Sequence, residues 1–237
     1  MLPSLPIAMH IPDGFLSGGV ATILWLLAIL AVANALRVAN AELDESRVPL
    51  LGVLAAFIFA VQMLNFPVAG GTSGHLLGAT LAAVLLGPWI ACLVMAVVLT
   101  TQCFAFADGG VSALGANIVN MGVLGALLAG FLMKALLPLL PKSREAFLGV
   151  VAITSWLAVM TGAAATSLQL AISGTVPLGT VLAPMLGVHG LIGVGEAVIT
   201  VAAVSAVLAS RPDLIALGRF PAATPVTAGA APAGSTP

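Results

Sequence analysis

GVATILWLLAILAVANALRV, residues 19–38, decides the class of fold. The stretch has the length and composition of a bilayer-spanning helix, which needs roughly 20 mostly apolar residues. The rest of the 237-residue chain has the same character, because 61% of its residues are hydrophobic and 6% are charged. Soluble domains carry about 25% charged residues. We therefore expect an all-α, polytopic membrane protein whose solvent is lipid.

Six further apolar stretches bring the predicted number of transmembrane helices to seven. The stretch at residues 75–86 is short, and we expect it to form a short helix sunk within the protein. Glycine, proline or charged residues separate the stretches from one another. The six stretches are residues 48–64, 75–86, 89–107, 115–140, 146–172 and 183–209.

The positive charges indicate how the chain is oriented. With seven crossings and the N-terminus outside, every Lys and Arg falls on the cytoplasmic side, as the positive-inside rule requires. An inverted or six-span arrangement would split the set. We therefore predict an external N-terminus and a cytoplasmic C-terminus. The cations are Arg37, Arg47, Lys134, Lys142, Arg144, Arg211 and Arg219.

Histidine occurs three times, each time in a break between apolar stretches: MHIPDG at 9–14, GGTSGH at 70–75 and GVHG at 187–190. Imidazole is the commonest transition-metal ligand in proteins. Residues 65–74 read as non-helical, and such backbone cannot face lipid. We expect this segment to fold against protein and to line an outward-facing pocket.

A Met-His pair at the start of a chain can chelate one ion through fused rings. The α-amine, the His10 backbone nitrogen and a His10 ring nitrogen supply three donors, and His75 would supply a fourth. Such a set suits Ni(II), Cu(II) or, less comfortably, Co(II), and not Mg²⁺ or Ca²⁺. It requires a free amine on Met9, so either translation begins at Met9 or the first eight residues are removed. Otherwise the His10 and His75 side chains must act with other donors.

Several motifs resemble the CbiM/NikM family, the cobalt/nickel substrate-capture subunits of energy-coupling factor transporters. The resemblance covers residues 9–213. It implies that Met9, His10 and His75 bind the ion in a bacterial cytoplasmic membrane protein. It also implies a transmembrane coupling subunit, two cytoplasmic ATPase subunits and a small auxiliary membrane subunit. The motifs are MHIPDGFL (9–16), NFPVAGGTSGHL (65–76), LLGPW (85–89), ADGG (107–110), LGAN (114–117), NMG (120–122), SGTVPLG (173–179) and GVH (187–189).

The chain divides into an N-terminal extension at 1–8, a transmembrane metal-capture domain at 9–212 and a cytoplasmic tail at 213–237. The extension lacks the positive n-region of a cleavable signal peptide. The tail is rich in Ala, Pro, Gly and Thr and carries few charges. We expect it to be disordered.

Seven residues are candidates for a supporting role around the metal. Glu196 lies inside the last span, where a carboxylate is costly and serves function or structure. Asn117 and Asn120 lie three positions apart, so a helix would place them on one face. His189 is open to an entry role or a structural hydrogen bond, and Asp13 to orienting or shaping the N-terminal turn. The full set is Asp13, Thr72, Ser73, Asn117, Asn120, His189 and Glu196.

These features favour a non-enzymatic subunit that captures Co(II) or Ni(II) as its transported ligand and holds no cofactor. The chain has no Walker A motif, so it cannot hydrolyse ATP by that route. A net charge of −1 gives no basis for nucleic-acid binding. An intramembrane metallohydrolase would need a general base, and HExxH is absent. A vitamin-capture subunit and a self-sufficient metal channel remain alternatives, and the sequence does not choose between cobalt and nickel.

Overall fold

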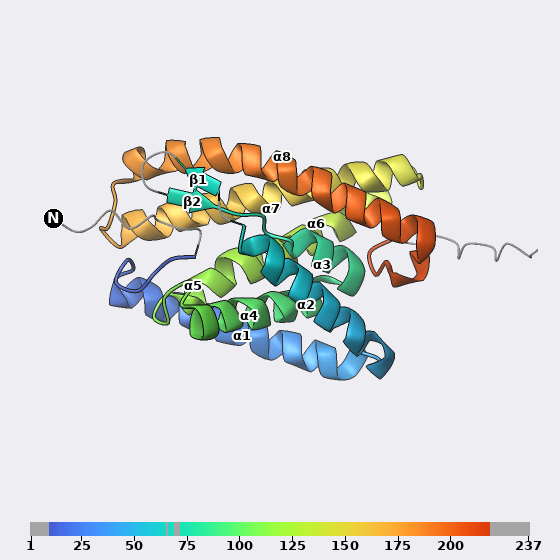
Figure 1. The fold of residues 1–237 in the computed structure, drawn as a ribbon, viewed down its shortest axis with the longest axis horizontal. Helices are drawn as coiled ribbons and strands as arrows, with labels where there is room; N and C mark the ends of the chain where they lie inside the picture. Colours follow the sequence, from blue (N-terminus) through green and yellow to red (C-terminus); the bar gives the residue numbers. More distant parts are fainter. Residues whose placement is uncertain (1–9, 65, 69–71, 219–237) are drawn as a thin grey trace, which may run out of the picture.

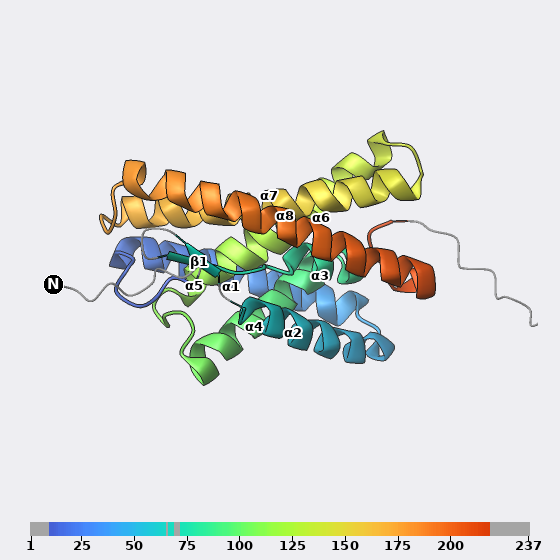
Figure 2. The same cartoon turned by 45° about the horizontal axis from the view of Figure 1, so that its top comes forward.

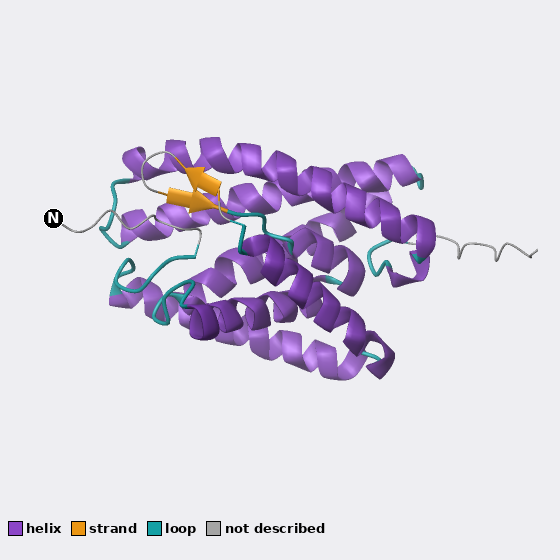
Figure 3. Cartoon of the chain, in the orientation of Figure 1, coloured by secondary structure: helices purple, strands orange, loops and turns teal. Residues whose placement is uncertain are grey.

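The computed structural model describes residues 10–64, 66–68 and 72–218, with the backbone alone for residues 66–68, 72 and 73. The predicted extension at 1–8, Met9 and the tail beyond residue 218 lie outside the described residues. The described chain is a helical bundle with one short hairpin (Figures 1 and 3).

In the described part of the chain, six helices are long and apolar enough to cross a bilayer. One is composite, because α5, a π-helical stretch η2, α6 and the 3-10 turn η3 follow one another without a break. Two further 3-10 turns, η1 and η4, flank α2 and α8. The elements are α1 (Gly18–Glu42), η1 (Glu45–Arg47), α2 (Val48–Gln62), α4 (Pro88–Phe106), α5 (Leu114–Ile118), η2 (Val119–Leu128), α6 (Ala129–Leu136), η3 (Leu137–Leu139), α7 (Arg144–Ile172), α8 (Leu178–Ser210) and η4 (Pro212–Leu214).

The seventh helix, α3 (Ala79–Leu86), is short, as the sequence predicts. Its eight residues are all buried. At a rise of about 1.5 Å per residue, α3 is too short to cross a bilayer about 30 Å thick. The expectation of seven helices is thus confirmed, but six rather than seven are long enough to span the membrane.

The non-helical segment before α3 forms a two-stranded antiparallel hairpin. Strand β1 (Phe66–Val68) pairs with β2 (Thr72–Gly74), with Phe66 opposite Gly74. The hairpin lies beside α8 and adds a small strand element that the all-α prediction lacks (Figure 3). The prediction that this segment is not helical is confirmed for the described residues. Extended backbone is tolerated here because the hairpin satisfies part of its own hydrogen bonding.

Helices α7 and α8 run side by side along most of their length (Figure 2). On the other side of the molecule, α1 packs against α4 and α5. Close approach depends on small residues: a Cβ on Gly115 would lie 2.5 Å from Cα of Trp25. Apolar side chains gain little free energy by leaving lipid, so helices in a membrane associate through close packing. Small residues such as Gly115 permit that close packing.

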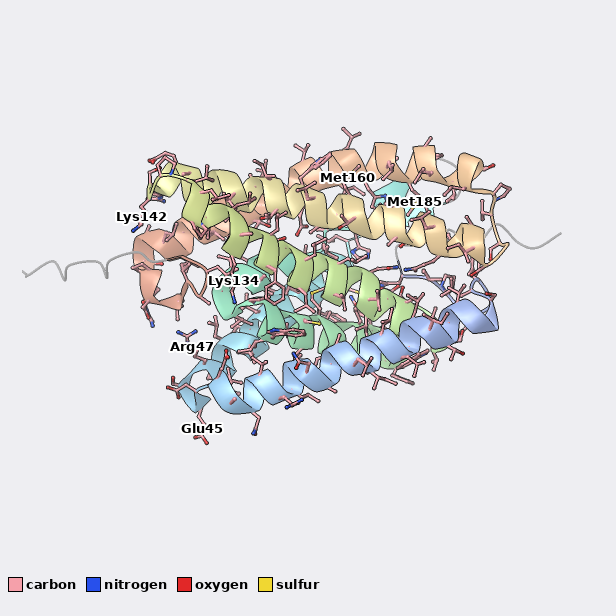
Figure 4. The ribbon with its side chains drawn as sticks, turned by 180° about the vertical axis from the view of Figure 1, so that it is seen from behind. Glu45, Arg47, Lys134, Lys142, Met160 and Met185 are labelled. Atoms are coloured by element: carbon pink, nitrogen blue, oxygen red, sulfur yellow. The ribbon has the colours of Figure 1, made fainter. Side chains whose placement is uncertain are left out.

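The first and last described residues lie at opposite ends of the bundle (Figure 1). Figure 4 places Arg47, Lys134 and Lys142 at the end where α8 finishes. Arg37 lies in the last turns of α1, Arg144 begins α7, and Arg211 follows α8, so these cations share that end. We refer to it as the cationic end. Among the described residues, the segregation of charge that underlies the predicted orientation is therefore present.

Candidate metal centre

Two histidines from remote parts of the chain meet at the end opposite the cationic end. His10 precedes α1, and His75 follows β2. Their ring centroids are 4.6 Å apart, with an interplanar angle of 52°. The side chains are buried, with exposed fractions of 2% for His10 and 1% for His75. We refer to this region as the histidine end.

The His75 imidazole is in the form that binds a metal. Its Nδ1 lies 2.8 Å from the backbone oxygen of Leu76. Because a carbonyl can only accept, Nδ1 carries the proton, and Nε2 is left with a lone pair. Nε2 is buried and has no hydrogen-bond partner among the described residues. Burial lowers the pKa of His75 to about 3, so the ring is neutral at physiological pH.

His10 lies beside a carboxylate that the sequence analysis treated only as part of a motif. Asp108 Oδ1 is 3.0 Å from His10 Nδ1. The contact is within ion-pair distance, and neither ring nitrogen of His10 has a hydrogen-bond partner by geometry among the described residues. Burial raises the pKa of Asp108, but the contact and charge of His10 outweigh it and leave the pKa below its usual range. Asp108 therefore brings a negative charge to the two imidazoles.

The segment carrying His10 is fixed by Asn117 of α5. The backbone N–H of Ile11 donates to Asn117 Oδ1 at 2.8 Å, and Asn117 Nδ2 donates to the Ile11 oxygen at 3.2 Å. The Gly110 N–H donates to the same Ile11 oxygen at 2.9 Å. Asn117 thus acts on the backbone next to a histidine and not on an imidazole. These bonds hold the segment before α1, which has no regular secondary structure, in one position.

Asp13 ties the same segment to the loop before α5. Its carboxylate accepts from the Ser112 N–H at 2.7 Å, from the Ser112 hydroxyl at 2.5 Å and from the Val111 N–H at 3.2 Å. The bonds from Ser112 hold the pKa of Asp13 below its usual range. Contact is so close that a Cβ on Gly110 would lie 2.2 Å from the Asp13 nitrogen. Only glycine fits there.

Glu196 caps the buried helix that follows His75. Its two carboxylate oxygens accept the N–H groups of Leu77 at 2.7 Å and Gly78 at 2.6 Å. Gly78 adopts φ +72°, a left-handed conformation that favours glycine, and it directly precedes α3. A carboxylate at a helix N-terminus is stabilised by the unpaired N–H groups and the helix dipole. Glu196 has the hydrogen-bonded, structural position that the sequence left open.

Among the remaining candidates, His189 lies beside Gly74, the residue that precedes His75. His189 donates from Nδ1 to the Met185 oxygen at 2.7 Å, and its unpaired Nε2 faces Gly74. Asn120 pairs with Gln169 of α7 at 2.6 and 2.9 Å, so it serves a different partner from Asn117. The backbone of Thr72 and Ser73 lies in β2, and their side chains are outside the described residues.

The described residues contain no cluster of three or more His, Cys, Asp or Glu side chains that could hold a metal ion. His10 and His75 bring two imidazoles together, with Asp108 beside one of them. The third predicted ligand, Met9, lies outside the described residues. The free cysteines Cys92 and Cys103 are buried, and neither lies in a donor cluster.

Comparison with known proteins places the chain in a family. A family profile described as "Cobalt uptake substrate-specific transmembrane region" (CbiM) matches residues 10–214. A putative metal transport protein of Haloquadratum walsbyi is 40% identical over 87% of this chain and 93% of its own length. A putative fused nickel transport protein, NikMN, of Archaeoglobus fulgidus is 40% identical over 87% of this chain and 68% of its own length.

A solved structure shares the fold. The crystal structure of a truncated transition metal transporter is 30% identical, covers 84% of this chain and 98% of that chain, and has a TM-score of 0.77. Together with the profile match across residues 10–214, these likenesses establish that the chain belongs to the CbiM family, as a cobalt/nickel transport component with several membrane-spanning helices.

Proposed function

We propose that this chain captures Co(II) or Ni(II) at the outer face of the bacterial cytoplasmic membrane, as the substrate-binding subunit of an energy-coupling factor transporter. The observation that carries the proposal is the meeting of His10 and His75. Two buried imidazoles with unpaired ring nitrogens are costly to keep unless a ligand uses them. Nitrogen donors favour late first-row metals over Mg²⁺ or Ca²⁺.

The His10 ring contributes through Nδ1 in this proposal. A chelate ring that includes the His10 backbone nitrogen and Nδ1 has six members, whereas one through Nε2 has seven and is more distorted. The Met9 amine and the His10 backbone nitrogen close a five-membered ring with the same ion. His75 Nε2 completes a four-nitrogen set. A chain whose first residue is Met9 would supply the free amine.

Asp108 then assists capture electrostatically. Its carboxylate lies 3.0 Å from the proposed donor Nδ1. A divalent cation bound at His10 would be close to this negative charge in a site with little water, where the attraction is strong.

The charge pattern supports the proposed orientation. The cationic end would face the cytoplasm, which places the histidine end outside. The first described residues would then lie outside and the last inside. Energy for uptake would come from a transmembrane coupling subunit and two cytoplasmic ATPase subunits, with a small auxiliary membrane subunit that assists metal loading.

Calorimetric titration of the purified chain in non-ionic detergent with Ni(II) and Co(II) tests the site. We expect His75→Ala to weaken binding at least a hundredfold, because it removes a donor at a preformed position. A chain beginning at Met9 should bind far more tightly than one that retains residues 1–8. Unchanged binding by His75→Ala would refute the ligand assignment, and equal affinity of the two chains would remove the amine from it.

Cys103→Ala provides a matched control. The Cys103 thiol donates to the Gly109 oxygen at 3.5 Å, in the loop that carries Asp108. The substitution disturbs this loop without removing a nitrogen donor, so we expect near-normal affinity. Metal uptake into liposomes by the purified chain alone, without ATPase subunits, would instead support a self-sufficient channel.

A further inference from the structure

A cavity of about 420 Å³ opens at the cationic end, far from the histidines. Parts of five elements surround it: the end of α1, the turn before α2, the α3–α4 junction, α6 and the chain after α8. Charged side chains on its wall are Glu42, Arg47 and Lys134, with Trp89 and Leu217 among the apolar ones. The metal site uses none of these residues.

Neither cation of this cavity lies within ion-pair distance of a described carboxylate, although the charge of Arg47 acts on Asp44 and Asp213. Arg47 is half-buried and Lys134 is exposed. Among the described residues, neither forms an ion pair or a side-chain hydrogen bond, whereas Arg211 binds Asp213 through two bonds of 2.7 and 2.9 Å. Lys134 Nζ lies 5.5 Å from the centroid of the Phe131 ring. The cavity wall therefore carries two cations and one carboxylate, Glu42, and none of the three forms an ion pair with a described residue.

A helix N-terminus opens into the same cavity. Helix α4 begins at Pro88, has 19 residues, and has no side chain capping its first turn. Gly87 and Pro88 line the cavity. The free N–H groups of a first turn attract anions, and phosphate is the ligand most often found there. The cavity therefore combines two positive side chains with a positive helix end.

In the proposed orientation, the cavity would lie near the lipid headgroups of the cytoplasmic leaflet. Helix α1 ends at Glu42 and α4 begins at Pro88, and both of these helix ends line the cavity. Figure 4 shows Arg47 and Lys134 at this end of the bundle. Basic pockets between membrane helices at such a surface bind anionic headgroups. Trp89 is of the residue type that favours the interface.

We propose that this cavity binds the phosphate group of an anionic phospholipid, with the phosphate between Arg47, Lys134 and the first turn of α4. Glu42 faces the same cavity and reduces its positive potential. It is suited to accept a hydrogen bond from a headgroup hydroxyl. The bound lipid would join α1 and α2 to α4, α6 and the chain that follows α8.

The test is a titration of the full chain, in non-ionic detergent, with dihexanoyl phosphatidylglycerol, dihexanoyl phosphatidylcholine and inorganic phosphate. We expect the first lipid to bind at least tenfold more tightly than the second. Arg47→Gln and Lys134→Gln should each weaken its binding about fivefold. Glu42→Gln should tighten binding several-fold, which a merely structural change would not do.

Arg37→Gln is the matched control, because Arg37 is an exposed cation of the same end and does not line the cavity. We expect it to change lipid affinity less than twofold. Equal binding of the two lipids, or an equal loss in Arg37→Gln, would overturn the site. Binding of inorganic phosphate without phosphatidylglycerol would overturn the lipid assignment. Nickel affinity should be unchanged in all four variants, so this test is independent of the metal proposal.

Discussion

The two ends of the molecule are held together in different ways. At the histidine end, side chains bond to backbone that is remote in sequence: Asn117 to Ile11, 106 positions away, and Glu196 to Leu77, 119 positions away. At the cationic end, most side-chain bonds are local, such as Ser143 to Ala146 and Arg211 to Asp213. Arg144, which donates to the Ser205 oxygen, is the exception.

This difference indicates that the histidine end is the one whose residues are held in fixed relative positions. Long-range bonds fix segments that have no secondary structure of their own, and His10 and His75 both lie in such segments. Local bonds complete helix ends, and at the cationic end only a few bonds, such as those from the Ala216 and Leu217 N–H groups to the Val84 oxygen, join remote described segments. We therefore expect changes at the histidine end to affect metal affinity and stability together, and changes at the cationic end to leave metal affinity unchanged.

The largest expected effect comes from Gly110→Ala. The new methyl group would lie 2.2 Å from the Asp13 nitrogen and 2.6 Å from the Pro12 carbonyl carbon, so backbone must move. We expect a loss of about 3 kcal/mol in unfolding free energy and at least a tenfold loss of nickel affinity. Thermal unfolding in detergent and calorimetric titration would measure the two effects.

Gly149→Ala is the matched change toward the cationic end. Gly149 lies in α7, and nothing lies within 4 Å of a Cβ placed there. Because alanine has a higher helix propensity than glycine, we expect the unfolding free energy to increase by up to about 1 kcal/mol and metal affinity to stay unchanged. Equal losses in the two glycine variants would contradict the contrast between the ends.

Glu196→Ala should have the second-largest effect. It leaves the buried N–H groups of Leu77 and Gly78 without partners, at a cost of about 2 to 3 kcal/mol. Since these groups directly follow His75, metal affinity should fall as well. Glu196→Gln keeps one acceptor and should recover part of both losses. A Glu196→Ala protein with normal nickel titration would show that the cap does not position His75.

Asn117→Ala should have a smaller effect, about 1 to 2 kcal/mol, because Gly110 still donates to the Ile11 oxygen. Asn117→Asp retains an acceptor for the Ile11 N–H and should be milder. We expect metal affinity to decrease from the wild type to Asn117→Asp and further to Asn117→Ala. If the alanine variant loses stability but binds nickel normally, the His10 segment is held by other contacts.

The sequence predicts the fold well where a single physical constraint dominates. Bilayer thickness sets the length of the apolar stretches, so five of the predicted long helices match the structure within a few residues. The last helix begins at Leu178 rather than at residue 183, and Pro184 lies inside it. A helix can tolerate proline in a bundle when neighbouring groups satisfy the freed carbonyl.

The site was less predictable because its contacts are long-range. Residue type and position in breaks suffice to single out His10 and His75. No local pattern shows that Asp108 would lie beside His10, or that Asn117 and Asn120 would bind different partners. Asn117 and Asn120 depart from the α-helical spacing that the sequence suggests, because the chain becomes π-helical at Val119, which lies between them. The one available signal for Asp108 was a carboxylate in a glycine-rich break of a membrane protein.

The smallest expected effect, Ser143→Ala, tests the other side of the contrast. Ser143 Oγ accepts the Ala146 N–H at 3.1 Å and caps α7. Loss of an N-cap lowers the unfolding free energy by about 1 kcal/mol, and Ser143→Asp should keep most of that stabilisation because Asp is also a good N-cap residue. Nickel affinity should be unchanged, because Ser143 caps the first turn of the 29-residue helix α7. The later turns, which lead to the histidine end, keep their own backbone hydrogen bonds. A Ser143→Ala variant with reduced affinity would mean that the ends are coupled through α7, and that local capping also serves the metal site.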